Sequence, residues 1–387
     1  MGVTLIRYWG SYFKSPRAVS NMVNQLKGPL AKGWDTHLVC CWPPEDEKWL
    51  QPLLDIGVKI EYMPRAKGNF DWKCMYRVCK LCRRLRCNVF HCDNMHTSPL
   101  IGASLARVAV RLWSKRSMNA AFERGGKETI RNRIVLSVRL SCLLATKTLA
   151  VSKTVREELI KLRIPSSKLM VFNNPMDSKI LCSVNRDKAR VVYGYAPSEI
   201  VITTIGHAVP VKGWDILLRA FSDIANEVPQ ARLLFVGSIT GYNESHHYEE
   251  LARFIDQNGL RTKVRFTGHL IEINEALAAS DIFVLPSRSE GFGIVLVEGL
   301  AAGLPCVSTK VGIASEVIQT GVNGFLLERE NYREMAKALL KLAKDSNLRK
   351  RLAEGARTTP LGVPTMEEYG DQLFNLYESL LRDHTKS

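Results

Sequence analysis

Residues 280–309, SDIFVLPSRSEGFGIVLVEGLAAGLPCVST, carry the clearest structural signal in the chain. The apolar run Ile282–Pro286 predicts a buried strand that ends in a polar loop. Gly291 and Gly293 then open a helical segment, which Gly303 ends before a second apolar run begins. A strand, a helix and another strand in this order are typical of a βαβ unit in a parallel sheet.

The loop between this strand and this helix has the composition of a ligand site. Its glycines let a ligand approach the backbone, and the free N–H groups at the start of a helix attract an anion. Glu290 lies in the loop and Glu298 about two turns into the helix. A carboxylate is repelled by phosphate but accepts hydrogen bonds from sugar hydroxyls. The loop therefore predicts a nucleotide-sugar site at the carboxyl edge of the sheet.

The same alternation of short strands and helical stretches runs through both halves of the chain. It predicts six strands before residue 173 and five between residues 200 and 308, hence an α/β fold with two Rossmann-like domains. The expected boundaries are 1–174 for the first domain, 175–195 for a linker and 196–360 for the second domain. Residues 361–387 are expected to form a helix that packs back on the first domain.

Charge and hydropathy narrow the choice of partners. The 387 residues carry a formal net charge of +16, with 20 Lys and Arg against five Asp and Glu between Glu61 and Arg156. Such a stretch is either a set of solvated helix faces or a surface that adheres to an anionic membrane, and its concentration in one half favours the membrane. Nucleic-acid binding is not favoured, because no RNA- or DNA-binding motif accompanies the charge. No transmembrane span or signal peptide is visible, so we expect a cytoplasmic protein, peripheral at the inner membrane face.

Ten cysteines raise the alternative of a zinc site, since five of them lie between Cys74 and Cys92. The spacing lacks the second half of a paired CxxC motif. Cys74 falls on an apolar helical face, which is typical of a small core residue. Reduced thiols and no metal are therefore expected.

The stretch EGFGIVLVEGLAAGLP, with Glu290 and Glu298 eight residues apart, resembles the donor-site signature of the family 4 (GT4) retaining glycosyltransferases. Gly206–Gly213, GHAVPVKG, is similar to the family's G-R-x4-K-G loop, and Asn174–Asp177 to its N-x-x-D segment. The resemblance implies the GT-B fold, in which two Rossmann-like domains face each other across a cleft. It also implies transfer of a sugar, from UDP above all, to a glycan or lipid-linked acceptor, as in surface polysaccharide synthesis.

The resemblance assigns roles to matched positions. Lys212 would neutralise the leaving diphosphate, Glu290 would contact the transferred sugar, and Glu298 would bind the ribose. The remaining donor-binding positions are Gly10, Gly291, Phe292, Gly293, Ile294 and Val295. The family retains anomeric configuration and needs no metal or other cofactor, and the chain contains no Asp-x-Asp motif.

The chain also departs from the family pattern. His207 stands where the family has a diphosphate-binding Arg, so His207 is charged beside phosphate, or a base such as Arg288 compensates, or the donor is held weakly. On the acceptor side, the candidates are Asp93, His96 and Arg116. His91 and His96 are also open to roles as structural histidines.

Two other functions remain open at this level. Another GT-B enzyme, such as a nucleotide-sugar epimerase, would change a nucleotide sugar without an acceptor. A non-catalytic basic binding protein would use the net charge and would not bind nucleotides.

Overall fold

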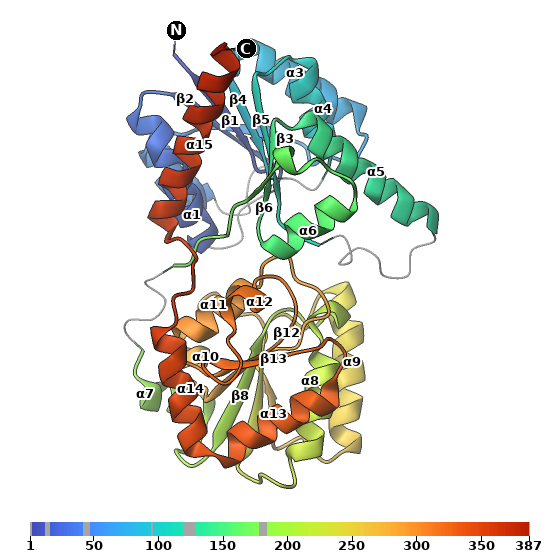
Figure 1. Ribbon diagram of the computed structural model, residues 1–387, viewed down its shortest axis with the longest axis vertical. Helices are drawn as coiled ribbons and strands as arrows, with labels where there is room; N and C mark the ends of the chain where they lie inside the picture. The colour runs from blue at the N-terminus through green and yellow to red at the C-terminus, as the bar shows by residue number, and fades with distance from the viewer. Residues whose placement is uncertain are drawn as a thin grey trace. The chain divides into compact units, whose positions relative to one another are not determined.

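The computed structural model describes residues 2–11, 16–41, 47–93, 96–118, 128–177 and 184–386. The chain forms two compact units that do not follow chain order. The first unit joins Met1–Pro175 to Val363–Ser387, and the second comprises Met176–Gly362. The C-terminal residues therefore return to the unit that contains the N-terminus (Figure 1).

The described residues of the first unit form a seven-stranded sheet in the order β3-β2-β1-β4-β5-β6-β7. Every neighbouring pair is parallel. The strands are β1 (Thr4–Tyr8), β2 (Asp35–Cys41), β3 (Lys59–Met63), β4 (Val89–Cys92), β5 (Val110–Lys115), β6 (Lys147–Ala150) and β7 (Leu169–Val171). The strand order reverses between β1 and β4, and sheets of this kind bind ligands at the carboxyl ends of strands beside such a reversal.

Helices cover both faces of this sheet (Figure 1). They are α1 (Pro16–Ala31), α2 (Gln51–Asp55), α3 (Trp72–Arg84), α4 (Ser98–Leu105), α5 (Glu128–Leu144), α6 (Lys153–Lys161) and α15 (Met366–Lys386), with short 3-10 turns η1 (Glu47–Leu50) and η3 (Ser166–Lys168). Local sequence sets two of the starts. The Asp71 carboxylate accepts from the Cys74 N–H at 3.2 Å before α3, and the Ser152 hydroxyl accepts from the Val155 N–H at 3.2 Å before α6.

The C-terminal helix α15 packs against α1. Tyr369, Leu373 and Tyr377 recur every four residues and are all buried, which gives the helix one continuous apolar face. The two helices approach closely at small residues. A Cβ added to Gly370 would lie 2.2 Å from the Asn24 carbonyl oxygen, so only glycine fits there.

The second unit has a parallel sheet of six described strands in the order β10-β9-β8-β11-β12-β13. The strands are β8 (Ile200–Ile205), β9 (Ala231–Val236), β10 (Val264–Phe266), β11 (Ile282–Leu285), β12 (Cys306–Thr309) and β13 (Gly324–Leu327). The helices are α7 (Arg186–Tyr193), α8 (Trp214–Ile224), α9 (Tyr242–Gln257), α10 (Asn274–Ala279), α11 (Ile294–Ala301), α12 (Ala314–Val317), α13 (Tyr332–Lys344) and α14 (Ser346–Thr358), with the 3-10 turn η5 (Pro210–Lys212). The order reverses between β8 and β11.

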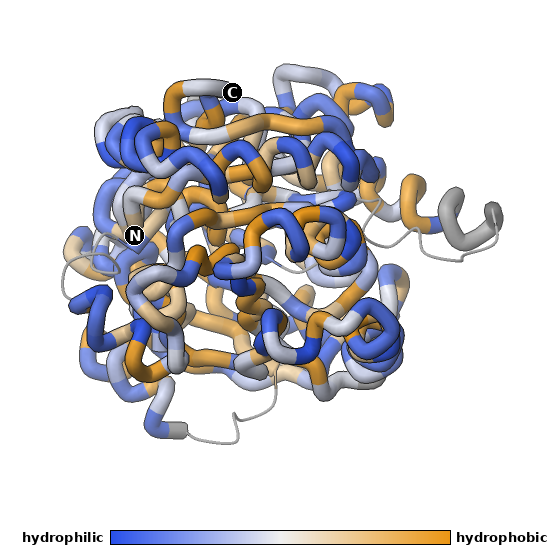
Figure 2. The backbone as a smooth tube through the Cα atoms, turned by 90° about the horizontal axis from the view of Figure 1, so that it is seen from below, coloured by the Kyte–Doolittle hydropathy of each residue, from blue (hydrophilic) through white to orange (hydrophobic). Residues whose placement is uncertain are grey.

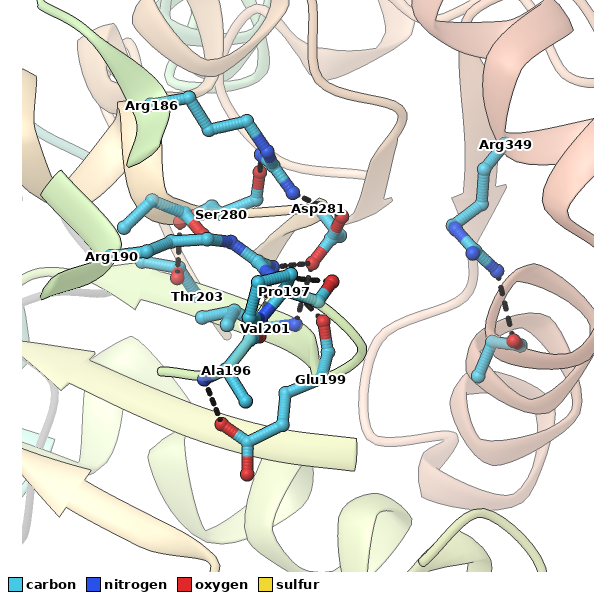
Figure 3. Close-up of polar contacts among 12 residues, drawn as sticks. Arg186, Arg190, Ala196, Pro197, Glu199, Val201, Thr203, Ser280, Asp281 and Arg349 are labelled. Atoms are coloured by element: carbon cyan, nitrogen blue, oxygen red, sulfur yellow. Dashed lines mark hydrogen bonds and ion pairs between the residues drawn. The ribbon is translucent and has the colours of Figure 1, made fainter. Parts of the chain in front are cut away.

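Residues 186–193 form α7 in the second unit, where the sequence predicted part of a linker over 175–195. Arg190 donates to one carboxylate oxygen of Asp281 at 2.6 Å, and Arg186 donates to the other at 2.6 Å (Figure 3). These ion pairs fasten α7 to the residue before β11. The buried face of α7 consists of Ala189, Arg190 and Tyr193, so it contains few large apolar side chains, which explains the linker prediction.

Two strands were absent from the sequence prediction, β5 in the first unit and β13 in the second. Arg111 and Lys115 interrupt the apolar pattern of β5. Inside the fold, Arg111 Nε donates to the Leu144 carbonyl at 2.8 Å, so a charged residue is accommodated in a strand. The four residues of β13, Gly324–Leu327, form a strand that the sequence analysis did not assign to any element.

In the described part of the chain, no helix is both long and apolar enough to cross a membrane. The helices instead alternate between hydrophilic and hydrophobic stretches (Figure 2). In α13, for example, Met335 and Leu339 are buried while Lys344 is exposed. That pattern is typical of helices that pack one face against a sheet.

Candidate active site

The two parts of the predicted donor loop meet at the carboxyl edge of the second sheet. β8 and β11 are parallel neighbours, so the segments that follow them leave the sheet at the same edge. Lys212 comes from the first segment and Glu290 from the second, and Lys212 Nζ lies 2.6 Å from Glu290 Oε1. Two residues 78 positions apart in sequence therefore form one ion pair, with side chains that are 23 % and 11 % exposed.

Ser287 completes this arrangement. Its hydroxyl donates to the same Glu290 oxygen at 2.8 Å, and its own carbonyl accepts from the Thr309 hydroxyl at 2.6 Å. The Glu290 carboxylate is therefore held by a cation from the loop after β8 and by a hydroxyl from its own loop. Sequence reasoning missed Ser287, although a small hydroxyl residue at the strand end was a usable signal.

Two glycines make this packing possible. Gly213, at the start of α8, has φ +66°, and a Cβ there would lie 2.1 Å from the Pro286 carbonyl oxygen. Gly293, at the start of α11, has φ +86°, a left-handed conformation that residues with a Cβ rarely adopt. The loops after β8 and β11 can touch because both positions lack a side chain.

The start of α11 has the features of an anion site. Its N-cap is Gly293, which has no side chain to occupy the first N–H groups of the helix. Ile294 and Val295 are the first two residues of the helix. Their N–H groups belong to the set that lacks partners within a helix, and the helix dipole favours negative charge at this end. The preceding Phe292 is buried and anchors the loop to the core.

Glu298 lies in the same helix, and its side chain is 1 % exposed. The interpretation of Glu298 as an exposed helix residue is therefore excluded. Charged side chains are rarely buried in an apolar helix such as α11, so the placement of Glu298 points to a specific role.

His207 and Arg288 have different surroundings. The His207 side chain is 57 % exposed, and its Nδ1 lies 3.8 Å from Glu244 Oε1. Arg288 forms two hydrogen bonds of 2.7 Å to Asp215 and also contacts Glu330. Burial favours the neutral form of Asp215, but Arg288 outweighs it and lowers the pKa of that carboxyl. Its guanidinium is thus shared between two carboxylates, and compensation by Arg288 for the family's Arg stays a prediction.

The first unit contains a cavity of about 430 Å³ at the carboxyl edge of its own sheet. It gathers four of the predicted residues: Gly10, Asp93, His96 and Arg116. Gly10 was assigned to the donor by resemblance, yet it lines the same cavity as the three acceptor-side candidates. The sequence did not single out the other polar and aromatic walls, which include Trp9, Arg65, Trp113, Ser114 and Lys115.

Asp93 lies between two arginines under this cavity. Arg7 Nη2 is 2.6 Å from one carboxylate oxygen, while Arg116 Nη2 and Nε are 2.7 and 3.0 Å from the other. Asp93 is 1 % exposed and Arg7 is fully buried, whereas Arg116 is 28 % exposed. Burial alone would raise the pKa of Asp93, but Arg116 and Arg7 outweigh it and hold that pKa well below its usual range.

Buried neutral groups surround Arg7. Tyr377 of α15 accepts from Arg7 at 3.0 Å, and Gln25 of α1 accepts at 2.7 Å. His91 Nδ1 also contacts Arg7, which can only donate, so the ring proton lies on Nε2 and is donated to Ser114 at 2.8 Å. Burial, then the charge on Arg7, lowers the pKa of His91 and keeps it neutral. His91 is therefore a structural histidine.

The cysteine-rich region shows no metal site. Among the described residues, no group of three or more His, Cys, Asp and Glu side chains is arranged to hold a metal ion. Cys74 is 4 % exposed, which confirms its prediction as a small core residue. The cysteines of the described residues are free thiols.

Two Rossmann-like units, one with an anion-attracting helix start beside a Lys–Glu pair, define a GT-B glycosyltransferase class. Family models agree: residues 185–359 match "Glycosyl transferases group 1" and residues 17–179 match "Glycosyltransferase Family 4". The chain belongs to this glycosyltransferase family. The family predicted from the motifs is confirmed.

Individual proteins that resemble this chain share 30% or less of its sequence in the three examples that follow. N-acetyl-alpha-D-glucosaminyl L-malate synthase of Bacillus anthracis is 30% identical over 60% of this chain and 60% of its own length. The capsular polysaccharide biosynthesis glycosyltransferase CapM of Staphylococcus aureus is 22% identical over 73% of this chain and 74% of its own length. The crystal structure of Anabaena Alr3699/HepE in complex with UDP superposes with a TM-score of 0.78. That match is 20% identical in sequence and covers 98% of this chain and 100% of the other.

Proposed function

We propose that this chain is a retaining glycosyltransferase that moves a sugar from a nucleoside diphosphate, UDP above all, to a glycan or lipid-linked acceptor. The observation that carries the proposal is the Lys212–Glu290 pair beside the glycine-led start of α11. It combines a cation and N–H donors for a diphosphate with carboxylates for hydroxyl groups. The solved structure of HepE contains UDP, which supports a uridine nucleotide as the donor class.

In this proposal the second unit holds the donor. The N–H groups of Ile294 and Val295 bind phosphate oxygens, and Lys212 exchanges part of its contact with Glu290 for the diphosphate. Glu290 is then free to accept from a hydroxyl of the sugar, and Glu298 accepts from the ribose. His207, five residues before Lys212 in the loop after β8, would add a donor in place of the family's Arg.

The reaction breaks the bond between the anomeric carbon and the diphosphate oxygen while the acceptor oxygen bonds to the same face of that carbon. Positive charge develops on the sugar and negative charge on the leaving phosphate. The Lys212 ammonium and the helix N–H groups stabilise the latter more in the transition state than in the ground state. The acceptor proton passes to a phosphate oxygen, so no metal or cofactor is required in this scheme.

The cavity of the first unit is the proposed acceptor site. It has the volume of a small-molecule site and lies at the carboxyl edge of its sheet. Asp93 and Arg116 would orient the acceptor. The names of the relatives include an L-malate synthase and a glycosyltransferase of capsular polysaccharide biosynthesis, so the products of similar proteins differ in chemistry.

Membrane adhesion is a further part of the proposal. On α3 and just before it, Phe70, Trp72 and Tyr76 are 54 %, 69 % and 63 % exposed. The basic residues Lys73, Arg77, Lys80 and Arg84 share this helix. Exposed aromatics beside basic side chains suit an anionic lipid surface, and they support an enzyme that is peripheral at a membrane. In this proposal the enzyme is cytoplasmic and does not bind nucleic acid.

Sedimentation with vesicles tests this adhesion. The chain is expected to pellet with vesicles containing phosphatidylglycerol more than with neutral phosphatidylcholine vesicles. Trp72→Ala with Tyr76→Ala should reduce pelleting, whereas the matched change Val191→Ala on exposed α7 should not. Equal sedimentation with both lipids would contradict the membrane role.

Thermal shifts across UDP, GDP, ADP and their glucose conjugates test the donor. A ligand of the native state raises the melting temperature by mass action, and the UDP series is expected to do so most. Lys212→Ala should lower turnover by roughly 10²–10³-fold, because it removes a cation aimed at developing charge. Arg351→Ala, an exposed residue elsewhere in the unit, is the matched control.

The same assay separates the two other functions. An epimerase would convert the nucleotide sugar with no acceptor present. A basic binding protein would show no nucleotide-dependent shift at all. Either result would replace the transferase proposal.

A further inference from the structure

The cavity of the first unit carries more positive charge than its own carboxylate balances. Its lining includes three basic residues, Arg65, Lys115 and Arg116. Among the described residues of the lining, Asp93 is the one acidic residue. Asp93 is already shared, since it pairs with Arg116 and with the buried Arg7.

The neighbouring polar groups that line the cavity do not supply the missing negative charge. Burial, followed by the charge on Arg65, lowers the pKa of His96 and keeps that ring neutral. Asp71 acts on His96 in the opposite direction, but its carboxylate accepts from backbone N–H groups at the start of α3 and does not line the cavity. Burial raises the pKa of Tyr377 to a value beyond physiological pH, so its phenol is also neutral. Glu158 attracts Lys115 but belongs to α6 and does not line the cavity. Within the described residues, the cavity floor therefore has an excess of positive charge.

Such an arrangement is unfavourable for folding. When a buried ion pair is not fully compensated, its desolvation costs more free energy than the attraction between the two charges returns. A second guanidinium on one carboxylate adds a cation that must share its anion with the first. Lys115 is 5 % exposed, and burial lowers its pKa to about 8, so the folded state is a poor environment for its charge. Strongly perturbed groups that converge on a cavity are typical of ligand sites.

We propose that the acceptor bound in this cavity carries an anionic group, a carboxylate or a phosphate ester, which pairs with Arg116 and Arg65. Trp9 stacks its ring 5.5 Å from the Arg116 guanidinium and holds it in place, while Trp113 offers an apolar wall to the rest of the molecule. Asp93 acts as a positioning residue, because it fixes Arg116 through two donors. The identification of the bound anion as the acceptor rests on the proposed function, whereas the anion site itself does not depend on it.

Calorimetric titration with a matched pair of probes tests the inference directly. Glycerol 3-phosphate and glycerol differ by one phosphate group, and inorganic phosphate and glycerate separate the phosphate and carboxylate arms. Glycerol 3-phosphate, glycerate or both are expected to bind the wild-type chain at least 10-fold more tightly than glycerol. Equal affinity for all four probes would overturn the proposal.

Two substitutions locate the site. Arg65→Ala removes an exposed side chain with little risk to folding, and should weaken anion binding by about 10-fold, as expected for a charge-assisted hydrogen bond. Arg116→Gln should weaken it further. Arg382→Ala, an exposed arginine of α15 in the same unit and outside the cavity, is the matched control and should leave the affinity unchanged.

Lys212→Ala separates this site from the donor site. It should weaken UDP binding and leave glycerol 3-phosphate binding intact, while Arg65→Ala should do the reverse. Loss of the anion effect with normal UDP binding would overturn only the present inference. Normal anion binding without any UDP binding would overturn only the proposed function. If Lys212→Ala, and not Arg65→Ala, weakened the binding of glycerol 3-phosphate, the anion site would belong to the second unit and the inference would be refuted.

Discussion

Glu298 is a buried charged residue whose position suggests a role in ligand binding rather than in the core. A carboxylate that is 1 % exposed inside an apolar helix would ordinarily be avoided, and Glu298 follows a helix start suited to phosphate. Glu298→Gln keeps the volume but removes the charge that accepts from ribose hydroxyls. UDP affinity measured by calorimetry should fall about 10-fold, with circular dichroism unchanged. Unchanged UDP affinity would show that Glu298 serves the core.

The buried charge of Lys115 is expected to lower the stability of the folded chain while it favours anion binding in the cavity. Burial lowers its pKa in the folded state to about 8, from 10.5, with partial relief from Glu158 and Cys142. Between pH 8 and 10.5 the unfolded chain binds more protons at this residue, so its contribution makes stability rise with pH. Below pH 8 both states are protonated and the folded state carries the full penalty.

Lys115→Met should therefore raise stability at pH 7 by about 2 kcal/mol while weakening anion binding. The gain should shrink as the pH approaches 10. Urea denaturation at pH 7 and pH 9.5 measures both effects. A variant less stable than the wild type at pH 7 would mean that the Lys115 contact with the Ser117 carbonyl outweighs the cost of burial.

Among the elements, α15 links the end of the chain to the first sheet. Leu373 is fully buried in the core that this helix shares with α1, and Tyr377 reaches the Arg7 network. Leu373→Ala leaves a cavity and should destabilise the first unit by about 2–5 kcal/mol in denaturant titrations. Leu376→Ala, a partly buried position of the same helix, should cost less. Equal losses would contradict the packing described for α15.

Tyr377 also connects that helix to the cavity. It accepts from Arg7, Arg7 holds Asp93, and Asp93 holds Arg116. The C-terminal helix thus supports the proposed acceptor site from beneath, through three consecutive polar contacts. A structural element far along the chain is thereby part of the framework of an N-terminal site.

For the whole molecule, the division into two units predicts unequal effects of truncation. Removing residues 363–387 takes α15 from the first unit and leaves Met176–Gly362 complete. The truncated chain should lose a cooperative transition for the first unit yet retain UDP binding in the second. Calorimetric melting with and without UDP measures both. Loss of UDP binding along with the transition would show that the second unit does not fold on its own.

The sequence determined the fold class and the donor loop because both depend on local patterns. Apolar runs, turn glycines and the motif from Glu290 to Glu298 are contiguous, and their physical meaning is set within about 20 residues. Lys212 and Glu290 were also predictable, since each follows a recognisable strand of a parallel sheet and neighbouring strands end at one edge.

Only the tertiary structure decided where charged residues find their partners. Arg7 and Tyr377 are 370 positions apart, and nothing local indicates that the two side chains meet beneath Asp93. The same is true of Arg288 in the loop after β11, which pairs with Asp215 and Glu330. The α7 helix and the charged strand β5 were missed for this reason. Ion pairs and hydrogen bonds between residues that are distant in sequence compensate charges that the local sequence would place at the surface. Such contacts depend on the order of the strands and helices in the fold, and the local hydrophobic pattern does not reveal them.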